Sequence, residues 1–301
     1  MIAPKPINSN TFILTPTVHI VVGPTAVGKT KYAIELAQKL NTEIISADAR
    51  QCYKELDIGV ARPSNEELAQ VKHHFIASHS INDTLNAGIY EAYALAKATE
   101  LLEKFGSVVM VGGTGLYIKA FVEGMDSIPA IDPVVRNQIQ HDFKSKGIAW
   151  LQGQIQAKDP GYWAQADQGE QQNAQRLSRA LEVVIGTGQS ILDFQLQAKK
   201  TRSFDIQKIG LEMPRELLYD RINQRVHKMV EMGLEEEVYA LRPHFHLNAL
   251  QTVGYQEWQP YFEGHQTKEA VIQAIQQNTR HYAKRQMTWF KKDPEISWNQ
   301  A

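Results

Sequence analysis

The sequence has 301 residues, a mass of 34.0 kDa and a hydrophobic fraction of 43%, which exclude a disordered chain and predict one large domain plus a smaller one. Its formal net charge of −1 excludes a protein that is basic overall, so any contact with nucleic acid must come from a local patch. The single cysteine, Cys52, excludes an intramolecular disulfide and a cysteine-built metal site and fits a reducing cytoplasm. We expect Cys52 to be an ordinary, semi-buried side chain and not a reactive thiol.

The N-terminal residues 1–17 contain three prolines and no charged start followed by an apolar run. We therefore expect a flexible tail and no signal peptide. The apolar run 18–22 predicts a buried strand, and the segment 31–40 places its apolar residues on one face of a helix. No stretch of the chain is apolar for long enough to predict a membrane span.

Between this strand and this helix, Gly23–Thr30 fits the pattern of a phosphate-binding loop. Its glycines let backbone N–H groups turn toward phosphate oxygens. Lys29 would reach the terminal phosphate, and Thr30 would offer its hydroxyl to Mg²⁺. The motif predicts a bound polyphosphate but leaves open which one and what chemistry follows.

Further strands and helices alternate along the next part of the chain. Residues 43–47 predict a strand that ends at Asp48, and residues 89–105 predict a helix with Gly106 at its C-cap. Residues 108–111 predict another buried strand. This alternation predicts an α/β fold, a P-loop-containing parallel sheet flanked by helices, with ligands at the carboxyl ends of its strands.

The segment from 125 to 198 has a different sequence pattern, with short helical stretches rich in Gln and Ala and no convincing strand. We expect an all-helical insertion domain over 125–198, within a core domain made of 18–124 and 199–301. In the core, residues 205–211 predict a strand and Pro214 opens a helix that Gly233 stops.

Two helices carry candidate anion-binding side chains. Arg221 and Arg225 lie four residues apart and share a helix face, although a solvated face paired with Glu216 or Asp220 explains them better when taken alone. The C-terminal helix, 268–292, has no acidic residue after Ala270 and mixes basic with aromatic side chains. This mixture suits a nucleic-acid backbone and a stacked base, or the aromatic side chains belong to the core.

The adjacent histidines His73 and His74 raise the question of a metal site. Neighbouring residues rarely aim at one ion, and no companion ligands follow at suitable spacing. We therefore expect a structural role for both.

Six sequence blocks extend over nearly the whole chain. They are Gly23–Thr30, Ser46–Gln51, Gly112–Tyr117, Arg176–Val183, Gln251–Tyr255 and Asn278–Gln286. Their order resembles the bacterial type of the tRNA dimethylallyltransferase family, and the series is far more specific than the loop alone.

The resemblance implies transfer of a dimethylallyl group from dimethylallyl diphosphate to the exocyclic amine of the adenosine 3′ of the anticodon, in tRNAs that read codons beginning with U. It implies Mg²⁺ as cofactor, a cytoplasmic monomer with no obligate protein partner, and an insertion that clamps the anticodon stem-loop. The phosphate loop would then hold a leaving group while a carbon is attacked.

The resemblance also implies roles for individual residues. Asp48 matches the general base, and Thr25 matches the threonine that contacts the oxygen bridging carbon and phosphorus. The expected diphosphate-binding residues are Gly23, Pro24, Ala26, Val27, Gly28, Lys29, Thr30, Arg221 and Arg225, with Thr30 also at the metal. The expected tRNA-binding residues, from the resemblance and the basic C-terminal helix, are Ala49, Arg50, Gln51, Thr114, Gln175, Arg176, Arg179, Arg280, Lys284 and Arg285.

Four residues depart from the family pattern. Ala49 and Val27 stand where serine is usual, and Val60 and Arg62 stand where threonine and lysine are usual. None of them removes the carboxylate or the loop lysine. We expect activity to survive, with effects on affinity and tRNA preference.

Three other functions compete. A small-molecule kinase would normally carry an acidic residue after the strand 108–111, where Gly112 and Gly113 stand instead. A nucleotide-switched RNA-binding protein would need the basic helix but not Asp48. An isopentenyltransferase acting on free adenine nucleotides would need neither the insertion nor the basic helix.

Overall fold

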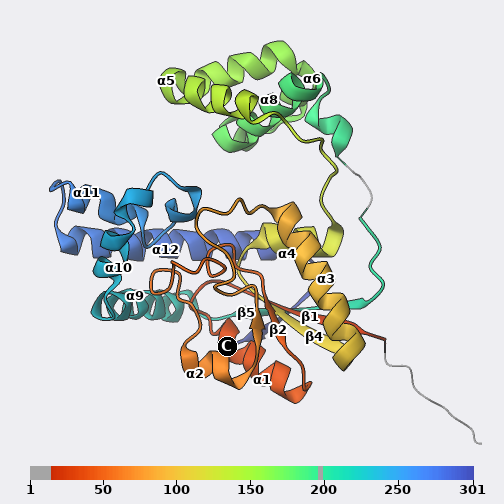
Figure 1. The fold of residues 1–301 in the computed structure, drawn as a ribbon, viewed down its shortest axis with the longest axis vertical. Helices are drawn as coiled ribbons and strands as arrows, with labels where there is room; N and C mark the ends of the chain where they lie inside the picture. Colours follow the sequence, from red (N-terminus) through yellow and green to blue (C-terminus); the bar gives the residue numbers. More distant parts are fainter. Residues whose placement is uncertain (1–14, 196–198) are drawn as a thin grey trace, which may run out of the picture. The chain divides into compact units, whose positions relative to one another are not determined.

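The computed structural model describes residues 15–195 and 199–301 (Figure 1). It divides the chain into two compact units. One unit contains the described residues up to Glu123 together with Thr201–Ala301, and the other contains those between Gly124 and Lys200. The predicted tail falls largely on residues 1–14, which lie outside the described residues.

A six-stranded, all-parallel sheet forms the centre of the first unit. The α/β prediction is therefore confirmed at the level of a parallel sheet flanked by helices. The two edge strands, at the ends of the order β3-β2-β4-β1-β5-β6, were not predicted. The strands are β1 (Thr17–Val22), β2 (Ile44–Ser46), β3 (His73–His74), β4 (Ser107–Val111), β5 (Asp205–Glu212) and β6 (Ile296–Gln300).

Helices cover both faces of this sheet, because a parallel sheet has to bury both of its faces. Side chains alternate along each strand, so Val109 packs against the α1 side while Met110 receives the Tyr90 hydroxyl from α3. The helices are α1 (Lys29–Lys39), α2 (Asn65–Gln70), α3 (Ala87–Phe105), α4 (Gly115–Glu123), α9 (Arg215–Glu231), α10 (Leu234–Ala240), α11 (Gln259–Phe262) and α12 (Lys268–Phe290).

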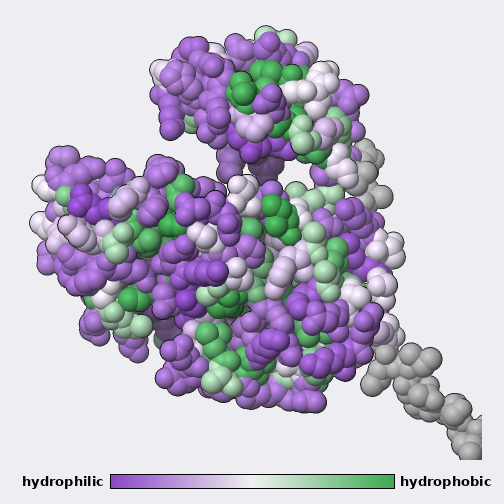
Figure 2. Space-filling view, in the orientation of Figure 1, coloured by the Kyte–Doolittle hydropathy of each residue, from purple (hydrophilic) through white to green (hydrophobic). Residues whose placement is uncertain are grey.

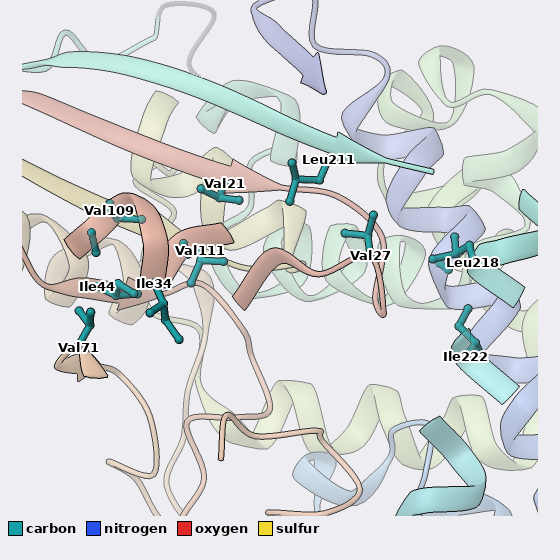
Figure 3. Close-up of a cluster of buried hydrophobic side chains, with 13 residues drawn as sticks. Val21, Val27, Ile34, Ile44, Val71, Val109, Val111, Leu211, Leu218 and Ile222 are labelled. Carbon is teal, nitrogen blue, oxygen red and sulfur yellow. The ribbon is translucent and has the colours of Figure 1, made fainter. Parts of the chain in front are cut away.

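One buried cluster connects the sheet to α1 and α9 (Figure 3). Ile34 of α1 packs over the strand residues, and Leu218 and Ile222 of α9 lie at the other end beside Val27. This packing holds the glycine loop between two helices that share one core.

The second unit is helical, with its own core around Leu151, Ile155 and Leu181. Asp132 and Asp159 accept hydrogen bonds from the first turns of the helices that follow them, with proline in each first turn, so each Asp-Pro pair marks a helix start. The helices are α5 (Pro133–Lys158, kinked at Gly147), α6 (Pro160–Gln165), α7 (Gln168–Gln171), α8 (Ala174–Thr187) and the 3-10 turn η1 (Ile191–Phe194).

The face drawn in Figure 2 is mostly hydrophilic, with hydrophobic residues in separate small patches. Among the described residues, no helix combines the length and the apolar character that a membrane span requires.

Candidate active site

A cavity of about 490 Å³ lies at the carboxyl ends of β1, β2 and β4. The glycine loop follows β1, Asp48 follows β2, and Gly112 follows β4, so three neighbouring strands bring their end loops together. Helices α9 and α12 contribute Arg225 and Tyr282 to the same wall.

The glycine loop has the backbone conformations that its sequence predicts. Gly23 has φ 145°, and a Cβ there would lie 2.5 Å from the carbonyl oxygen of Leu211. Gly28 has φ 107° and precedes α1 with no side-chain cap and no acidic residue in the first turn. The first N–H groups of α1 therefore have no side-chain acceptor and face the cavity end, which suits an anion.

Lys29 folds back over the loop, where its Nζ donates a hydrogen bond of 2.8 Å to the carbonyl oxygen of Pro24. Burial lowers the pKa of Lys29 to about 7, and the positive charge of Arg225 contributes to this shift. Asp48 opposes it. An anionic ligand would favour the charged form and raise this pKa.

Val27 lies 1% exposed in the hydrophobic core and does not line the cavity. Its side chain therefore does not contact a ligand there, and the difference from serine changes how the loop is anchored. Pro24 is buried as well, so only its carbonyl contributes to the loop interior, through Lys29.

Asp48 is oriented by its own turn. Its Oδ1 accepts hydrogen bonds from the N–H of Arg50 at 2.8 Å and from that of Gln51 at 3.2 Å. In the part of the chain that the structure describes, Oδ2 has no hydrogen-bond donor, and Asp48 lines the cavity. One oxygen is thus fixed and the other is free to accept a proton.

Thr25 is held from two directions. Its N–H donates to Oε1 of Gln286 at 2.8 Å, and its hydroxyl accepts a hydrogen bond from the guanidinium of Arg225. Gln286 is 5% exposed and also donates from Nε2 to the carbonyl oxygen of Gly113 at 3.0 Å. Gln286 was not predicted as a site residue, although the block Asn278–Gln286 ends on it.

The two arginines of α9 line the cavity together. The alternative of a solvated, locally paired face is wrong for Arg225, which is half-buried and bonded to Thr25. Burial, and then the charge of Arg221, lowers the pKa of Arg225 to about 10, so it remains a cation at neutral pH. Arg221 is more exposed, with Nη2 3.8 Å from where a Cβ on Gly28 would stand.

A second chamber of about 100 Å³ adjoins the first. The two chambers share six residues, which form the boundary between them: Thr25, Asp48, Val60, Ala61, Arg225 and Tyr282. The rest of the second chamber is largely apolar. Its apolar side chains include Val60, Ala61, Val226, Met229, Val253 and Ile275.

The segment after Asp48 is held mainly through its backbone. The N–H of Ala49 donates to Oγ1 of Thr114 at 3.0 Å, so a methyl side chain at position 49 does not disturb this contact. Gln51 donates from Nε2 to the carbonyl oxygens of Val60 and Ala61 at 3.2 and 2.9 Å. Two expected tRNA-binding residues, Gln51 and Thr114, therefore also shape the cavity wall.

Arg62 has a structural role in the same region. Its guanidinium donates to the carbonyl oxygens of Tyr53, Lys54 and Leu56 and lies 3.6 Å from Asp57. This fan of contacts fixes the turn before Val60, which lines both chambers.

The basic residues of α12 are not equivalent. Arg280 points to α9, where Nη1 donates to Oδ1 of Asn223 at 2.7 Å. Lys284 and Arg285 are exposed, and the Arg285 guanidinium lies 5.7 Å from the ring centre of Tyr282. Phe290 is only 3% exposed, so for this residue the alternative that the aromatic side chains belong to the core is correct.

The remaining expected tRNA-binding residues lie on α8 of the helical unit. Gln175 and Arg176 are exposed, and Arg176 forms a 2.6 Å ion pair with Glu170. Arg179 pairs with the buried Glu182 at 3.2 Å. Arg50, in the first unit, lines the second chamber.

The histidines and the cysteine have structural surroundings. His74 is buried with its Nε2 2.6 Å from Glu43, and the Nδ1 of His73 contacts the carbonyl oxygen of Val71. Among the described residues, no cluster of acidic, histidine or cysteine side chains could hold a metal. Cys52 is completely buried, not semi-buried as expected, and burial raises its pKa to about 12, so the thiol is unreactive.

Gly112 and Gly113 exclude the acidic residue that a kinase would carry after β4. A Cβ on Gly112 would lie 2.2 Å from the carbonyl oxygen of Ala47, and one on Gly113 would lie 2.1 Å from Nε2 of Gln286. The space beside β4 is already filled by backbone and by Gln286.

Comparison with known proteins gives a consistent result. The family model described as IPP transferase matches residues 51–293. A tRNA dimethylallyltransferase of Christiangramia forsetii is 48% identical over 92% of this chain and 91% of its own length. The structure resembles the tRNA isopentenylpyrophosphate transferase of Bacillus halodurans, with a TM-score of 0.69, 34% identity and coverage of 95% and 90% of the two chains. A eukaryotic dimethylallyltransferase acting on tRNA, 22% identical with a TM-score of 0.77, shares the fold.

Proposed function

The chain belongs to the IPP transferase family, and from this membership we propose that it is a tRNA dimethylallyltransferase. It transfers a dimethylallyl group from dimethylallyl diphosphate to the exocyclic amine of the adenosine 3′ of the anticodon, in tRNAs that read codons beginning with U. The reaction takes place in the cytoplasm, and the protein acts as a monomer without an obligate partner. The observation that carries the proposal is the boundary between the two chambers, where a free carboxylate oxygen, a hydroxyl and a guanidinium meet.

The diphosphate binds in the larger chamber. The uncapped N-terminus of α1 offers N–H groups, and Lys29, Arg221 and Arg225 offer positive charge. As the carbon–oxygen bond breaks, negative charge grows on the departing diphosphate, and donors fixed in advance stabilise it. Thr25, held by Arg225 and Gln286, donates to the bridging oxygen.

The apolar second chamber takes the five-carbon chain of the donor. The reactive carbon then lies near the boundary, within reach of the adenine amine. The amine nitrogen forms a bond to this carbon while the carbon–oxygen bond breaks and its electron pair leaves with the diphosphate. The amine proton passes to Oδ2 of Asp48, which acts as general base.

Mg²⁺ would be held at this site mainly by phosphate oxygens of the bound diphosphate and not by a cluster of protein side chains. Among the described residues, no group of acidic, histidine or cysteine side chains could hold a metal ion, whereas Thr30 lines the cavity beside Lys29. Mg²⁺ usually keeps several waters and binds one or two protein groups plus phosphate oxygens, and Thr30 provides such a group. When bound, the ion supplies neutralisation of the diphosphate charge.

Binding of tRNA involves both units. The adenosine has to leave its stacked position to reach the boundary. The side chains of Arg50, Lys284 and Arg285 in the first unit, and of Gln175, Arg176 and Arg179 in the helical unit, grip the anticodon stem-loop. The helical unit acts as the clamp.

The decisive experiment is mass spectrometry of an anticodon stem-loop after incubation with the protein, Mg²⁺ and dimethylallyl diphosphate. We expect one five-carbon unit on the loop adenosine. Prenylation of AMP with an untouched stem-loop would instead support an enzyme that modifies free nucleotides. Phosphate transfer in an ATP-only control would support a kinase.

A further inference from the structure

Helix α12 carries a row of three side chains that leads away from the cavity. Tyr282, Arg285 and Trp289 are spaced three and four residues apart and therefore share one helix face. Tyr282 lines both chambers, and the guanidinium of Arg285 lies 5.7 Å from its ring centre. Trp289 follows one turn farther along the same face.

Trp289 is unusually exposed for a residue of its type. Its side chain is 41% exposed, although burial of an indole is strongly favourable. The ring also has a defined position, since Nε1 lies 2.2 Å from where a Cβ on Gly115 would stand. Only glycine at position 115 lets the indole lie against the start of α4. The neighbouring Leu116 is 48% exposed as well.

The charged side chains that α12 itself carries along this row have one sign. No acidic residue occurs between Ala270 and Lys292, while Lys284 and Arg285 are exposed on α12. Positive side chains next to an exposed aromatic ring are typical of single-stranded nucleic-acid sites, where cations bind phosphates and rings stack on bases. A purely apolar partner would leave these cations unused.

We propose that Trp289 stacks on the base of a nucleotide next to the reactive adenosine in the anticodon loop, and that Arg285 binds the adjoining phosphate. The inference rests on the proposed function and assigns a positioning role within it. Turning the adenosine out removes a stacking partner from its neighbour. The indole replaces that partner, which favours the extruded state and draws the adenosine toward Asp48.

The test uses a stem-loop that carries the fluorescent base 2-aminopurine next to the adenosine. Four forms of the full-length protein are compared: wild type, Trp289→Phe, Trp289→Ala and Tyr239→Ala. Tyr239 is a matched control, because it is an aromatic residue 58% exposed on α10. With wild type and Tyr239→Ala, we expect quenching of the fluorescence and equal stem-loop affinity. For Trp289→Ala we expect about tenfold to a hundredfold weaker stem-loop binding and a higher KM, the range for loss of one base–aromatic stack. Trp289→Phe should retain most of the affinity.

Two outcomes overturn the inference. One is an unchanged stem-loop affinity in Trp289→Ala. The other is that Trp289→Ala loses affinity for a non-reactive dimethylallyl thiodiphosphate by the same factor as for the stem-loop and also has a lower melting temperature. This result would make the indole only a structural anchor. Failure of the wild-type protein to prenylate any stem-loop would instead reject the proposed function itself.

Discussion

The guanidinium of Arg225 donates a hydrogen bond to the hydroxyl of Thr25, although the two residues are 200 positions apart in the sequence. Thr25 belongs to the glycine loop and Arg225 to α9, and both lie on the boundary between the two chambers. The contact places a positive charge behind the hydroxyl that, in the proposed reaction, faces the breaking carbon–oxygen bond. It strengthens Thr25 as a donor, because a hydroxyl that accepts from a cation donates more strongly.

Replacement of Arg225 should therefore affect chemistry more than tRNA binding. We expect Arg225→Ala to lower the single-turnover rate by about a hundredfold, as for removal of a donor that stabilises a developing anion. Arg225→Lys should recover part of this loss, since it keeps the charge but not the planar geometry. Stem-loop affinity should stay at the wild-type value.

Arg215→Ala is the matched control, because Arg215 is an exposed arginine of the same helix. It should keep the wild-type rate. Equal losses in Arg215→Ala and Arg225→Ala would show that the overall positive charge matters, and not the contact with Thr25.

Replacement of Asp48 by asparagine separates its two roles. In Asp48→Asn the amide oxygen would still accept the N–H groups of Arg50 and Gln51, so the turn should persist. The proton acceptor is lost, and we expect turnover to fall by at least about a hundredfold while the stem-loop still binds. Asp83→Asn is the control, since Asp83 is an exposed carboxylate that also accepts a backbone N–H. Retained turnover in Asp48→Asn would assign the base to another group.

The pKa of Lys29 predicts a proton uptake on donor binding. With a pKa of about 7, Lys29 is mostly neutral at pH 8 in the free protein. The diphosphate favours the ammonium form and raises the pKa, so binding at pH 8 should take up about one proton, and binding below pH 6 should take up almost none. Calorimetry of dimethylallyl diphosphate binding in two buffers with different ionisation enthalpies measures this number. A binding enthalpy at pH 8 that does not depend on the buffer would contradict the prediction.

The sequence predicted those parts of the fold that have a strong local pattern. The run 108–111 is continuously apolar, and the run 18–22 is apolar except for His19, because these strands are central and covered on both faces. Strands β3 and β6 escaped prediction. β3 has two residues, and in β6 only Ile296 is buried, so their place at the edges depends on pairing with a neighbour and not on their own composition.

The same limit applies to the site. Asp48 can be predicted from the sequence because it follows a strand, and Lys29 because it belongs to a known loop pattern. Gln286 is not, because its partners Thr25 and Gly113 are 261 and 173 residues away. The loop pattern also cannot tell that the side chain of Val27 turns into the core, since this follows from its packing with α9 and β5.

Glu237 holds the turn at Ile58 and Gly59, next to the cavity wall, and its removal should destabilise the protein. Its carboxylate accepts hydrogen bonds from the N–H groups of Ile58 and Gly59 at 2.8 and 3.1 Å and from the Tyr255 hydroxyl at 2.5 Å. Burial and the charge of Glu237 raise the pKa of Tyr255, so this hydroxyl remains a donor at neutral pH. Glu237→Ala leaves three donors without their acceptor, and we expect the free energy of unfolding to fall by about 2–4 kcal/mol.

Urea unfolding followed by circular dichroism measures this loss. Glu236→Ala is the matched control, because Glu236 is its exposed neighbour on α10 and should change stability by less than about 0.5 kcal/mol. The turn at Gly59 packs against the Tyr255 ring, with only 2.5 Å between that ring and a Cβ built on Gly59. Since Val60 and Ala61 follow directly and line both chambers, donor affinity should fall together with stability in Glu237→Ala. Equal unfolding midpoints for the two variants would show that the turn holds its position without this carboxylate.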